Sequence, residues 1–325
     1  MKTNDKDPLL EIEGLEVNFN TRSGIVQAAR GVNIEIDYGE TLGLVGESGS
    51  GKSVTVQAAM GLISSPGKIV NGDVRWQGRS IIGPKGAKYL KQVRGKDISM
   101  IFQDAMVSLN PIFTIGTQIC EVLCHHMGMT KKQARKKAVE LIELVGISAP
   151  ETRLKQYPYE YSGGMLQRIM IAMALSCNPK LLIADEPTTA LDVTIQAQIL
   201  ELIASLQERL NLSVIMITHD LGVIAQVCHR VAVMYAGKIV EMANVDEIYE
   251  NPRHPYTKGL LRATPRPDVV TERMIEIEGV PPNLINLPKG CAFMPRCSET
   301  HERCLNPPKP DFIQGKRYVS CWRAV

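Results

Sequence analysis

One segment has the residue types and spacing of a phosphate-binding loop. Residues 46–53 read Gly-Glu-Ser-Gly-Ser-Gly-Lys-Ser and match the pattern G-x-x-x-x-G-K-[ST]. Glycines let backbone amides turn inward around phosphate oxygens, and the amides that start the following helix favour an anion. Lys52 would bring a positive charge to the β- and γ-phosphates, and the Ser53 hydroxyl would ligate Mg²⁺. The remaining predicted contacts are Gly46, Ser48, Gly49, Ser50 and Gly51.

A pair of acids ends an apolar run further along the chain. Residues 181–186 read Leu-Leu-Ile-Ala-Asp-Glu. An aspartate at the end of a strand can hold Mg²⁺ directly or through water, which is the role expected for Asp185. Glu186 points to the other side of the strand, where its carboxylate can polarise a water for attack on the γ-phosphate. Two acids at a strand end are common, but the phosphate loop upstream makes this pair a predicted hydrolytic site.

A second glycine-rich segment also precedes an apolar helical run. Ser162, Gly163 and Gly164 come before residues 169–175 and provide another anion site at the start of a helix. The serine lies 23 residues before Asp185. A single triphosphate does not need two such sites on one chain.

Residues 161–168, Tyr-Ser-Gly-Gly-Met-Leu-Gln-Arg, resemble the signature sequence of ABC-transporter ATPases. This resemblance implies a head-to-tail dimer in which the signature of one subunit caps ATP on the phosphate loop of the other, so hydrolysis depends on association. Tyr161 and Met165 stand where the commonest form of the family has leucine and glutamine. The serine and both glycines are intact, so activity is still expected.

The resemblance also implies roles for single residues outside these motifs. Phe19 resembles the aromatic residue that stacks on adenine, with an ordinary strand-core phenylalanine as the alternative. Gln103 looks like the glutamine that touches Mg²⁺ and the attacking water. Asp192, in the string Ala190-Leu191-Asp192, looks like part of a loop that crosses the dimer interface, and His219 resembles the switch histidine that contacts the γ-phosphate. The implied catalytic residues are therefore Glu186, His219 and Gln103, and the implied Mg²⁺ ligands are Ser53, Gln103 and Asp185.

Three further strings, residues 103–111, 253–257 and 281–284, resemble segments of the dipeptide/oligopeptide importer ATPases, and the likeness covers essentially the whole chain. It implies a subunit that hydrolyses ATP to power peptide import. The implied partners are a second ATPase subunit of the same or another kind, two transmembrane permease subunits and an extracytoplasmic peptide-binding protein, without nucleic acid. The implied place is the cytoplasmic face of the inner membrane, as a peripheral protein. A nickel chelate or glutathione as cargo, and a soluble ABC ATPase outside transport, remain alternatives.

Four of the eight cysteines are clustered near the end of the chain: Cys291, Cys297, Cys304 and Cys321. Four thiolates in a short, proline-rich segment suit a metal. Structural zinc sites usually contain C-x2–4-C pairs, which are absent here, whereas iron–sulfur clusters tolerate varied spacing. Unligated thiols are the third possibility. Some peptide-importer ATPases carry a [4Fe–4S] cluster in this segment, so the resemblance favours that cofactor beside ATP and Mg²⁺, with zinc as the alternative.

Short apolar runs separated by helical stretches predict the elements that position these residues. Such runs are typical of strands in a parallel sheet buried on both faces. The predicted strands are residues 33–36, 41–45, 73–76, 98–102, 181–184, 214–218 and 231–235. Between residues 117 and 146 the pattern is helical, with Thr130 and Gln133 as a capping box and Gly146 as a stop.

Composition limits the remaining choices. The chain has 325 residues, and its 37 Lys and Arg against 34 Asp and Glu give a net charge of +3, which disfavours a strongly basic nucleic-acid binder. The polar opening and the lack of a long apolar run predict a cytosolic protein. Of the 19 prolines, 11 lie in residues 244–325, which predicts a loop-rich end.

The expected fold class is therefore α/β. It would comprise a P-loop ABC ATPase core with an antiparallel β subdomain and a helical subdomain, followed by a small loop-rich cysteine domain. The expected boundaries are residues 1–250 for the ATPase, with a helical insert at about 105–175, and 251–325 for the C-terminal domain.

Overall fold

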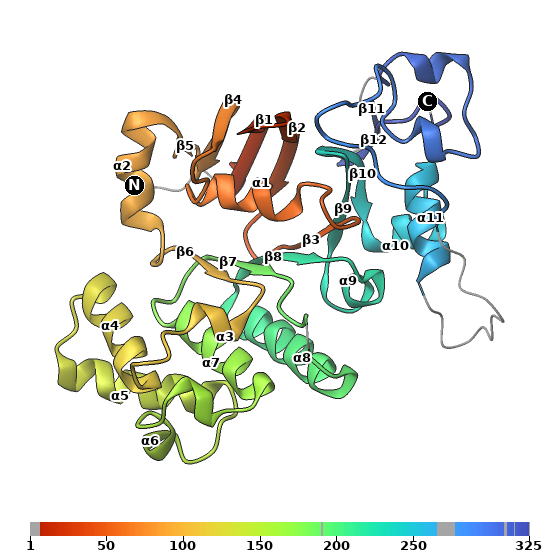
Figure 1. The fold of residues 1–325 in the computed structure, drawn as a ribbon. Helices are drawn as coiled ribbons and strands as arrows, with labels where there is room; N and C mark the ends of the chain where they lie inside the picture. The colour runs from red at the N-terminus through yellow and green to blue at the C-terminus, as the bar shows by residue number, and fades with distance from the viewer. Residues whose placement is uncertain (1–6, 190, 265–276, 309–310, 315, 325) are drawn as a thin grey trace. The chain divides into compact units, whose positions relative to one another are not determined.

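The computed structural model describes residues 7–189, 191–264, 277–308, 311–314 and 316–324. The chain forms two compact units. The first contains the residues up to 37 together with 41–87 and 217–325, and the second contains 38–40 and 88–216. Figure 1 labels the elements of both. Along the described residues, no helix combines the length and the apolar character that crossing a membrane requires.

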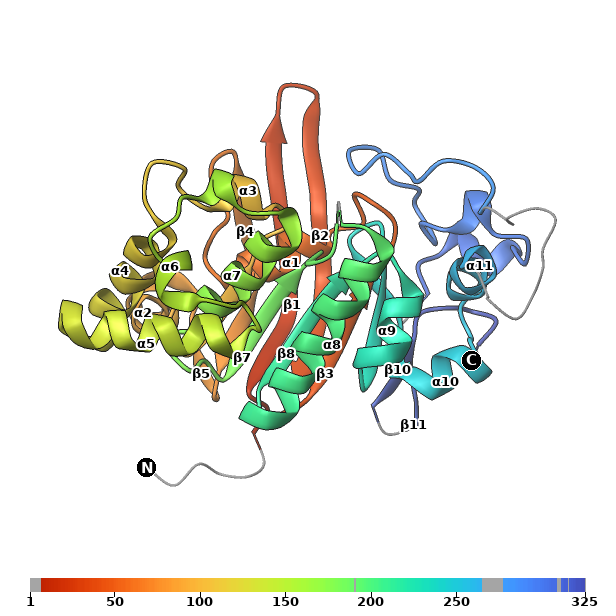
Figure 2. The ribbon, with the colours of Figure 1, turned by 90° about the horizontal axis from the view of Figure 1, so that it is seen from below.

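The first unit contains an antiparallel sheet of four strands in the order β2-β1-β4-β5. The strands are β1 (Leu10–Thr21), β2 (Gly24–Ile36), β4 (Gly67–Trp76) and β5 (Arg79–Ser80). Figure 2 shows β1 and β2 as a long hairpin. The register of this pair shifts between Ile12 and Leu15 and again after Val17, so the alternation of buried and exposed side chains is interrupted. These bulges explain why the sequence pattern did not predict β1.

A second sheet in this unit positions the phosphate loop. Its strands are β3 (Thr41–Val45), β9 (Arg230–Tyr235), β10 (Lys238–Asn244), β12 (Arg317–Val319) and β11 (Asp311–Gln314), in the order β11-β12-β10-β9-β3. β3 pairs with β9 in parallel, and every residue of both strands is buried, as the apolar runs predicted. The helices of this unit are α1 (Lys52–Ala59), α9 (Leu221–Val227), α10 (Val245–Glu250) and α11 (Pro255–Ala263).

The C-terminal segment, residues 251–325, is attached to the rest of this sheet through a buried carboxylate. The side chain of Glu241, on β10, is fully buried and accepts hydrogen bonds from the backbone amides of Arg253 and His254, both at 2.8 Å. These amides directly precede α11. The Arg317 guanidinium, on β12, lies 3.8 Å from the same carboxylate. Beyond residue 276 the regular structure consists of β11, β12 and two short 3-10 helices, Met294–Arg296 and Glu302–Leu305, in the part described.

The second unit places helices around a short parallel sheet. β6 (Ile98–Ile101) pairs in parallel with β7 (Leu181–Asp185), and β7 neighbours β8 (Ser213–Thr218). The helices are α3 (Ala105–Ser108), α4 (Ile115–Met127), α5 (Lys131–Leu144), α6 (Pro150–Arg153), α7 (Gly163–Leu175) and α8 (Val193–Leu210), and α2 (Gly83–Val93) crosses from the first unit. The predicted capping box of Thr130 and Gln133 is confirmed at the start of α5, and Gly146 follows that helix with φ +75°.

Candidate nucleotide-binding and hydrolysis site

The phosphate loop connects β3 to α1, which is the context that its sequence requires. Gly46, Gly49 and Gly51 have φ values of +153°, +75° and +106°. A Cβ atom on Gly46 would lie 2.2 Å from the Met234 carbonyl oxygen, and one on Gly51 would lie 2.2 Å from that of Ala28. The neighbouring backbone thus leaves no room for a side chain at either position, and the loop follows a path that only glycine permits.

Several polar groups of the loop fit a triphosphate. The buried Ser50 hydroxyl has no hydrogen-bond partner among the described residues. Gly51 is the N-cap of α1 and has no side chain that could accept a hydrogen bond from the first amides of this helix. Lys52 is 6% exposed and its Nζ donates to the carbonyl oxygens of Gly46 and Glu47 at 2.7 and 3.0 Å. A buried cation, a spare hydroxyl and a helix N-terminus together suit a polyanion.

Phe19 and His219 also belong to the first unit. Phe19 lies on β1, opposite Val26 of β2 and Gly67 of β4, and its side chain is half-buried. A Cβ atom on Gly67 would approach its ring to 2.6 Å, so the ring covers that glycine. His219 is exposed and directly follows β8. Both residues therefore retain open surface, as binding of a ligand requires.

The acidic pair lies in the second unit with Gln103. Asp185 ends β7 and is 5% exposed. Glu186 follows with φ +47°, a left-handed backbone conformation that is unusual for a residue with a side chain and is often found at functional sites. Its Oε2 atom accepts hydrogen bonds from Gln103 Nε2 at 3.1 Å and from Thr189 Oγ1 at 2.9 Å. Thr189 is not among the predicted site residues, because a threonine three residues after the acid carries no distinctive signal.

The signature residues start α7. Ser162 is the N-cap, and its Oγ accepts a long hydrogen bond of 3.4 Å from the Met165 amide. Gly163 and Gly164 are the first two helical residues, and a Cβ atom on Gly164 would lie 2.6 Å from the Ile195 side chain on α8. This glycine therefore lets two helices approach closely.

Tyr161, beside the signature serine, and Asp192, before α8, each form a hydrogen bond within the second unit. Tyr161 is 9% exposed and its hydroxyl donates to the Arg153 carbonyl at 2.5 Å, so the departure from leucine adds a hydrogen bond inside the helical unit. Asp192 caps α8, where its Oδ1 accepts from the Ile195 amide at 3.0 Å. Ala190, from the same predicted interface loop, lies outside the described residues.

The predicted site residues thus fall into two sets. The first unit contains the phosphate loop with Ser53, as well as Phe19 and His219. The second contains Gln103, Asp185 and Glu186, together with the signature residues and Asp192. Within the second set, the structure brings Gln103 directly to Glu186. The expected Mg²⁺ ligands come from both units.

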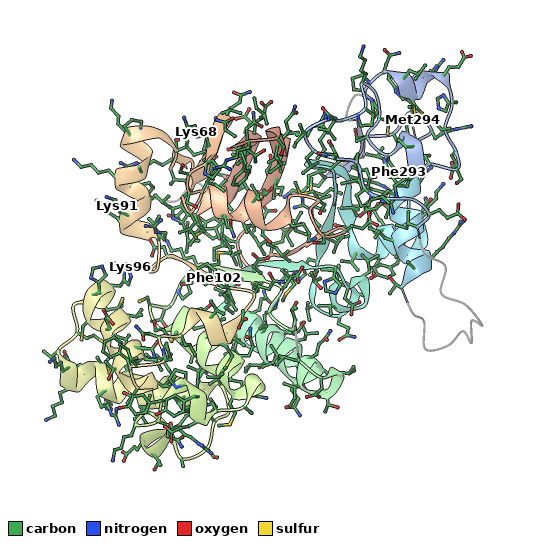
Figure 3. All side chains as sticks on the ribbon, in the orientation of Figure 1. Lys68, Lys91, Lys96, Phe102, Phe293 and Met294 are labelled. Carbon is green, nitrogen blue, oxygen red and sulfur yellow. The ribbon has the colours of Figure 1, made fainter. Side chains whose placement is uncertain are left out.

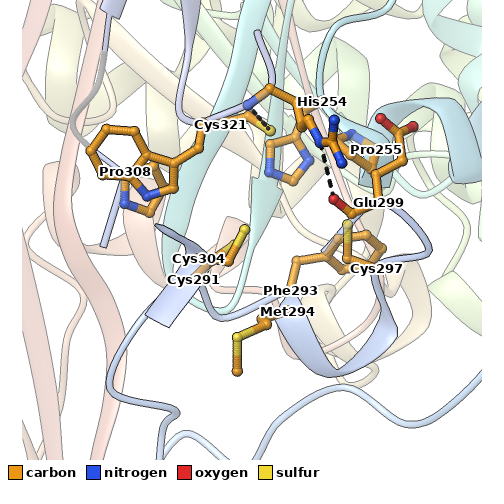
Figure 4. A pocket seen from close by; sticks show the side chains of 12 residues that line it. His254, Pro255, Cys291, Phe293, Met294, Cys297, Glu299, Cys304, Pro308 and Cys321 are labelled. Carbon is orange, nitrogen blue, oxygen red and sulfur yellow. Dashed lines mark hydrogen bonds between the residues drawn. The ribbon is translucent and has the colours of Figure 1, made fainter. Parts of the chain in front are cut away.

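The prediction of an iron–sulfur cluster in the C-terminal segment is wrong. Cys291, Cys297, Cys304 and Cys321 line one pocket, shown in Figure 4. Nevertheless, no group of three or more His, Cys, Asp or Glu side chains in the described part of the chain is arranged to hold a metal ion. All four cysteines are free.

The surroundings of these cysteines give a physical reason for the correction. Burial raises the pKa of Cys291, Cys297 and Cys321 above the usual thiol value, which favours protonated thiols over the thiolates that bind metals. Phe293 and Trp322 line the same pocket, so aromatic side chains share its wall with the sulfurs. The sequence predicted that the four cysteines lie close together, and they do line one pocket, but without an arrangement that would hold a metal ion.

Comparisons with known proteins agree with the geometry of the loop and the signature. Residues 29–189 match the ABC transporter family, and residues 240–304 match the C-terminal region of the oligopeptide/dipeptide transporter family. The oligopeptide transport ATP-binding protein OppD of Bacillus subtilis is 55% identical over 97% of this chain and 88% of its own length. The dipeptide transport ATP-binding protein DppD of the same species is 49% identical over 97% and 95%.

Solved structures show the same fold at lower identity. A dimeric ATP-binding cassette in a post-hydrolysis state with ADP and Pi is 26% identical, with a TM-score of 0.64 over 73% of this chain and 98% of that one. The protein cbiO1 of Clostridium perfringens, part of an ABC transporter complex, is 27% identical, with a TM-score of 0.63 over 76% and 92%. The predicted α/β class with an antiparallel sheet and helical elements is confirmed. The chain therefore belongs to the ABC ATPases, among the ATP-binding proteins of oligopeptide and dipeptide transporters.

Proposed function

We propose that this chain is the ATP-hydrolysing subunit that powers import of dipeptides or oligopeptides through an ABC transporter. The observation that carries the proposal is the 55% identity to an oligopeptide transport ATP-binding protein across 97% of the chain. The phosphate loop, whose glycines, spare hydroxyl and buried lysine suit a polyanion, supports ATP as the substrate.

The proposal assigns roles to the site residues. Ser53, Gln103 and Asp185 hold Mg²⁺, Glu186 is the base, and His219 contacts the γ-phosphate. The hydrogen bond from Gln103 to Glu186 supports a shared role in orienting the attacking water. Phe19 stacks on adenine, and Ser162 with its two glycines completes the site of a second subunit, in which Asp192 belongs to the interface loop.

The proposed assembly has two ATPase subunits, two transmembrane permeases and an extracytoplasmic peptide-binding protein, with this chain peripheral at the cytoplasmic face of the membrane. A solved dimer of an ATP-binding cassette at 26% identity supports the pairing of ATPase subunits. Residues 1–250 form the ATPase domain, with its helical insert at about 105–175, and residues 251–325 form the C-terminal region.

Uptake by cells tests the proposal. A strain that lacks the gene should take up labelled dipeptide or tripeptide poorly, and the wild-type gene should restore uptake while the Glu186→Gln variant should not. Labelled nickel chelate and glutathione are measured in parallel. Restoration of one of these cargoes without peptide uptake would contradict the proposed cargo, and unchanged uptake of all of them would contradict a role in import.

A further inference from the structure

Glu47, the second residue of the phosphate loop, is held at each of its polar groups. Its amide donates to the Tyr256 hydroxyl at 2.9 Å. Its carbonyl oxygen accepts from Lys52 Nζ at 3.0 Å and from the Ser50 amide at 3.2 Å. Its carboxylate accepts two hydrogen bonds from Arg296, with Nη1–Oε2 at 2.7 Å and Nη2–Oε1 at 2.9 Å. The loop is therefore fixed from inside by its own lysine and from outside by the C-terminal segment.

Arg296 itself has little freedom to move. Its side chain is 3% exposed, whereas that of Glu47 is 28% exposed. Its Nε and Nη2 atoms also donate to the carbonyl oxygens of Glu278 and Ile277, both at 3.0 Å. The guanidinium carbon lies 5.9 Å from the centre of the Tyr235 ring. A bidentate pair with a fixed arginine holds a carboxylate in one orientation.

Aromatic packing connects this arginine to the core of the first unit. The ring centroid of Phe293, three residues earlier, lies 5.2 Å from that of Tyr235 and 5.3 Å from that of Tyr256. Figure 3 labels Phe293 in the C-terminal segment. Tyr256, which accepts from the Glu47 amide, thus packs against the segment that contains Arg296. Movement of either one would change the position of the phosphate loop.

The same C-terminal segment also contacts the hairpin that carries Phe19. The Gln27 amide on β2 donates to the Leu284 carbonyl at 3.1 Å. A Cβ atom on Gly24 would lie 2.7 Å from the Ile285 side chain, so this part of the segment lies against the hairpin. The segment therefore reaches the hairpin of the expected adenine contact as well as the phosphate loop.

The charge of Glu47 explains why its pairing with Arg296 is important for phosphate binding. A carboxylate inside a loop that binds phosphates repels them unless a cation neutralises it. Lys52 donates to the carbonyl oxygen of Glu47, whereas Arg296 pairs with its carboxylate. Hydrogen bonding to Glu47 raises the pKa of Arg296, in keeping with an ionised pair.

We propose that Arg296 is a positioning residue for ATP binding: by pairing with Glu47, it neutralises and orients the phosphate loop and couples nucleotide binding to the C-terminal segment. This inference rests on the proposed ATPase function. Because coupling between two sites is reciprocal, bound nucleotide should in turn stabilise the residues around Arg296.

The test measures Mg-ATP and Mg-ADP affinity by titration calorimetry on the full-length chain. Arg296→Ala should weaken binding of Mg-ATP about tenfold, since it leaves a carboxylate unpaired beside the triphosphate. Arg296→Lys, which keeps the charge and loses the bidentate geometry, should lie between this variant and wild type. Arg303→Ala, an exposed arginine in the same segment, is the matched control and should bind as wild type does.

The double variant Glu47→Gln/Arg296→Ala separates charge from structure. If Arg296 acts through the Glu47 carboxylate, removing that charge should restore Mg-ATP affinity to within about threefold of wild type. Mg-ATP affinity in the double variant that is as low as in Arg296→Ala, or unchanged affinity in Arg296→Ala, would overturn the inference. Melting temperatures identify any variant that does not fold. If Arg296→Ala does not fold, Arg296→Lys decides: weaker Mg-ATP binding than wild type supports the inference, and equal binding contradicts it.

Hydrogen exchange gives a second readout that a purely structural arginine would not move. The amides of Met294, Arg296 and Cys297 should exchange more slowly with Mg-ADP in the wild type, and this protection should be smaller in Arg296→Lys. Protection that is absent in the wild type, or unchanged in the variant, would also contradict the coupling. Wild-type protein that binds neither nucleotide would instead refute the proposed function, so the two failures are distinct.

Discussion

The side-chain amide of Gln103 donates a hydrogen bond of 3.1 Å to the carboxylate of Glu186, a residue 83 positions later. The amide comes from the segment after β6, and the carboxylate follows β7 in a left-handed backbone conformation. Since these strands are parallel neighbours, their ends place both side chains at one edge of the sheet. This contact orients the acid that the sequence predicts to be the general base.

Glu186→Gln should reduce steady-state ATP hydrolysis roughly 100-fold or more, because an amide cannot take the proton of the attacking water. Mg-ATP binding should persist, since the variant retains the size of the side chain. Phosphate release and nucleotide titration measure the two effects. The same substitution at exposed Glu250 is the control, and hydrolysis near the wild-type rate in Glu186→Gln would show that another group is the base.

Ser162→Ala should impair hydrolysis and leave the nucleotide affinity of the isolated subunit unchanged. Loss of one hydrogen bond to a charged phosphate oxygen, about 1.5–3 kcal/mol, corresponds to a roughly ten- to hundredfold slower reaction. Its own N-cap bond is long at 3.4 Å, so the stability loss should be near the lower end of the usual range, about 0.5 kcal/mol. Thr130→Ala removes a cap from α5 without touching the signature. Equal activity losses in both variants would indicate a general effect of helix destabilisation.

Glu241→Ala should lower the free energy of unfolding by about 3 kcal/mol or more, because it leaves two backbone amides and the Arg317 guanidinium without their buried carboxylate. Glu250→Ala, on an exposed side chain of α10, should change it by less than about 0.5 kcal/mol. Urea unfolding measures both. A small effect at residue 241 would mean that water replaces the carboxylate when α11 moves.

His254 should make stability fall with acid. Burial lowers its pKa to about 3, with a smaller contribution from Lys258. Its Nδ1 accepts from the Tyr256 amide at 3.0 Å, which requires the neutral ring. The unfolded chain binds a proton below about pH 6.5 and the folded chain does not, so this stability is present above that pH and is lost between about pH 6.5 and 3.

Between pH 7 and 5 this one residue should cost about 2 kcal/mol of unfolding free energy. His254→Asn keeps an acceptor near the Tyr256 amide and removes the titrating ring. Urea unfolding at both pH values should therefore show a smaller decrease for the variant than for the wild type. Equal pH dependence in the two proteins would assign the acid sensitivity to other groups.

Much of the buried sheet could be predicted from the sequence, because β3, β7 and β9 are buried along their whole length and consist mostly of apolar residues. The hairpin of β1 and β2 could not, since its bulges break the alternation on which the prediction relies. The position of the phosphate-loop motif between a strand and a helix could also be predicted, because the motif consists of neighbours in sequence. The pair of Glu47 and Arg296 was missed because 249 residues separate its members. The cysteines show the opposite error, because their clustering in sequence and the family resemblance predicted a metal cluster, whereas the described residues form no group that would hold a metal ion.

The strand β12 also covers a sheet edge that could otherwise pair with a strand of a second molecule. β10 pairs with β9 on one side and with β12 on the other, so its backbone has no unpaired edge where β12 covers it. Five successive residues of β10 are buried and four of them are apolar, so its exposed backbone would readily accept another strand. A chain shortened before residue 317 would leave that edge open, and strand addition between molecules would lead to aggregation.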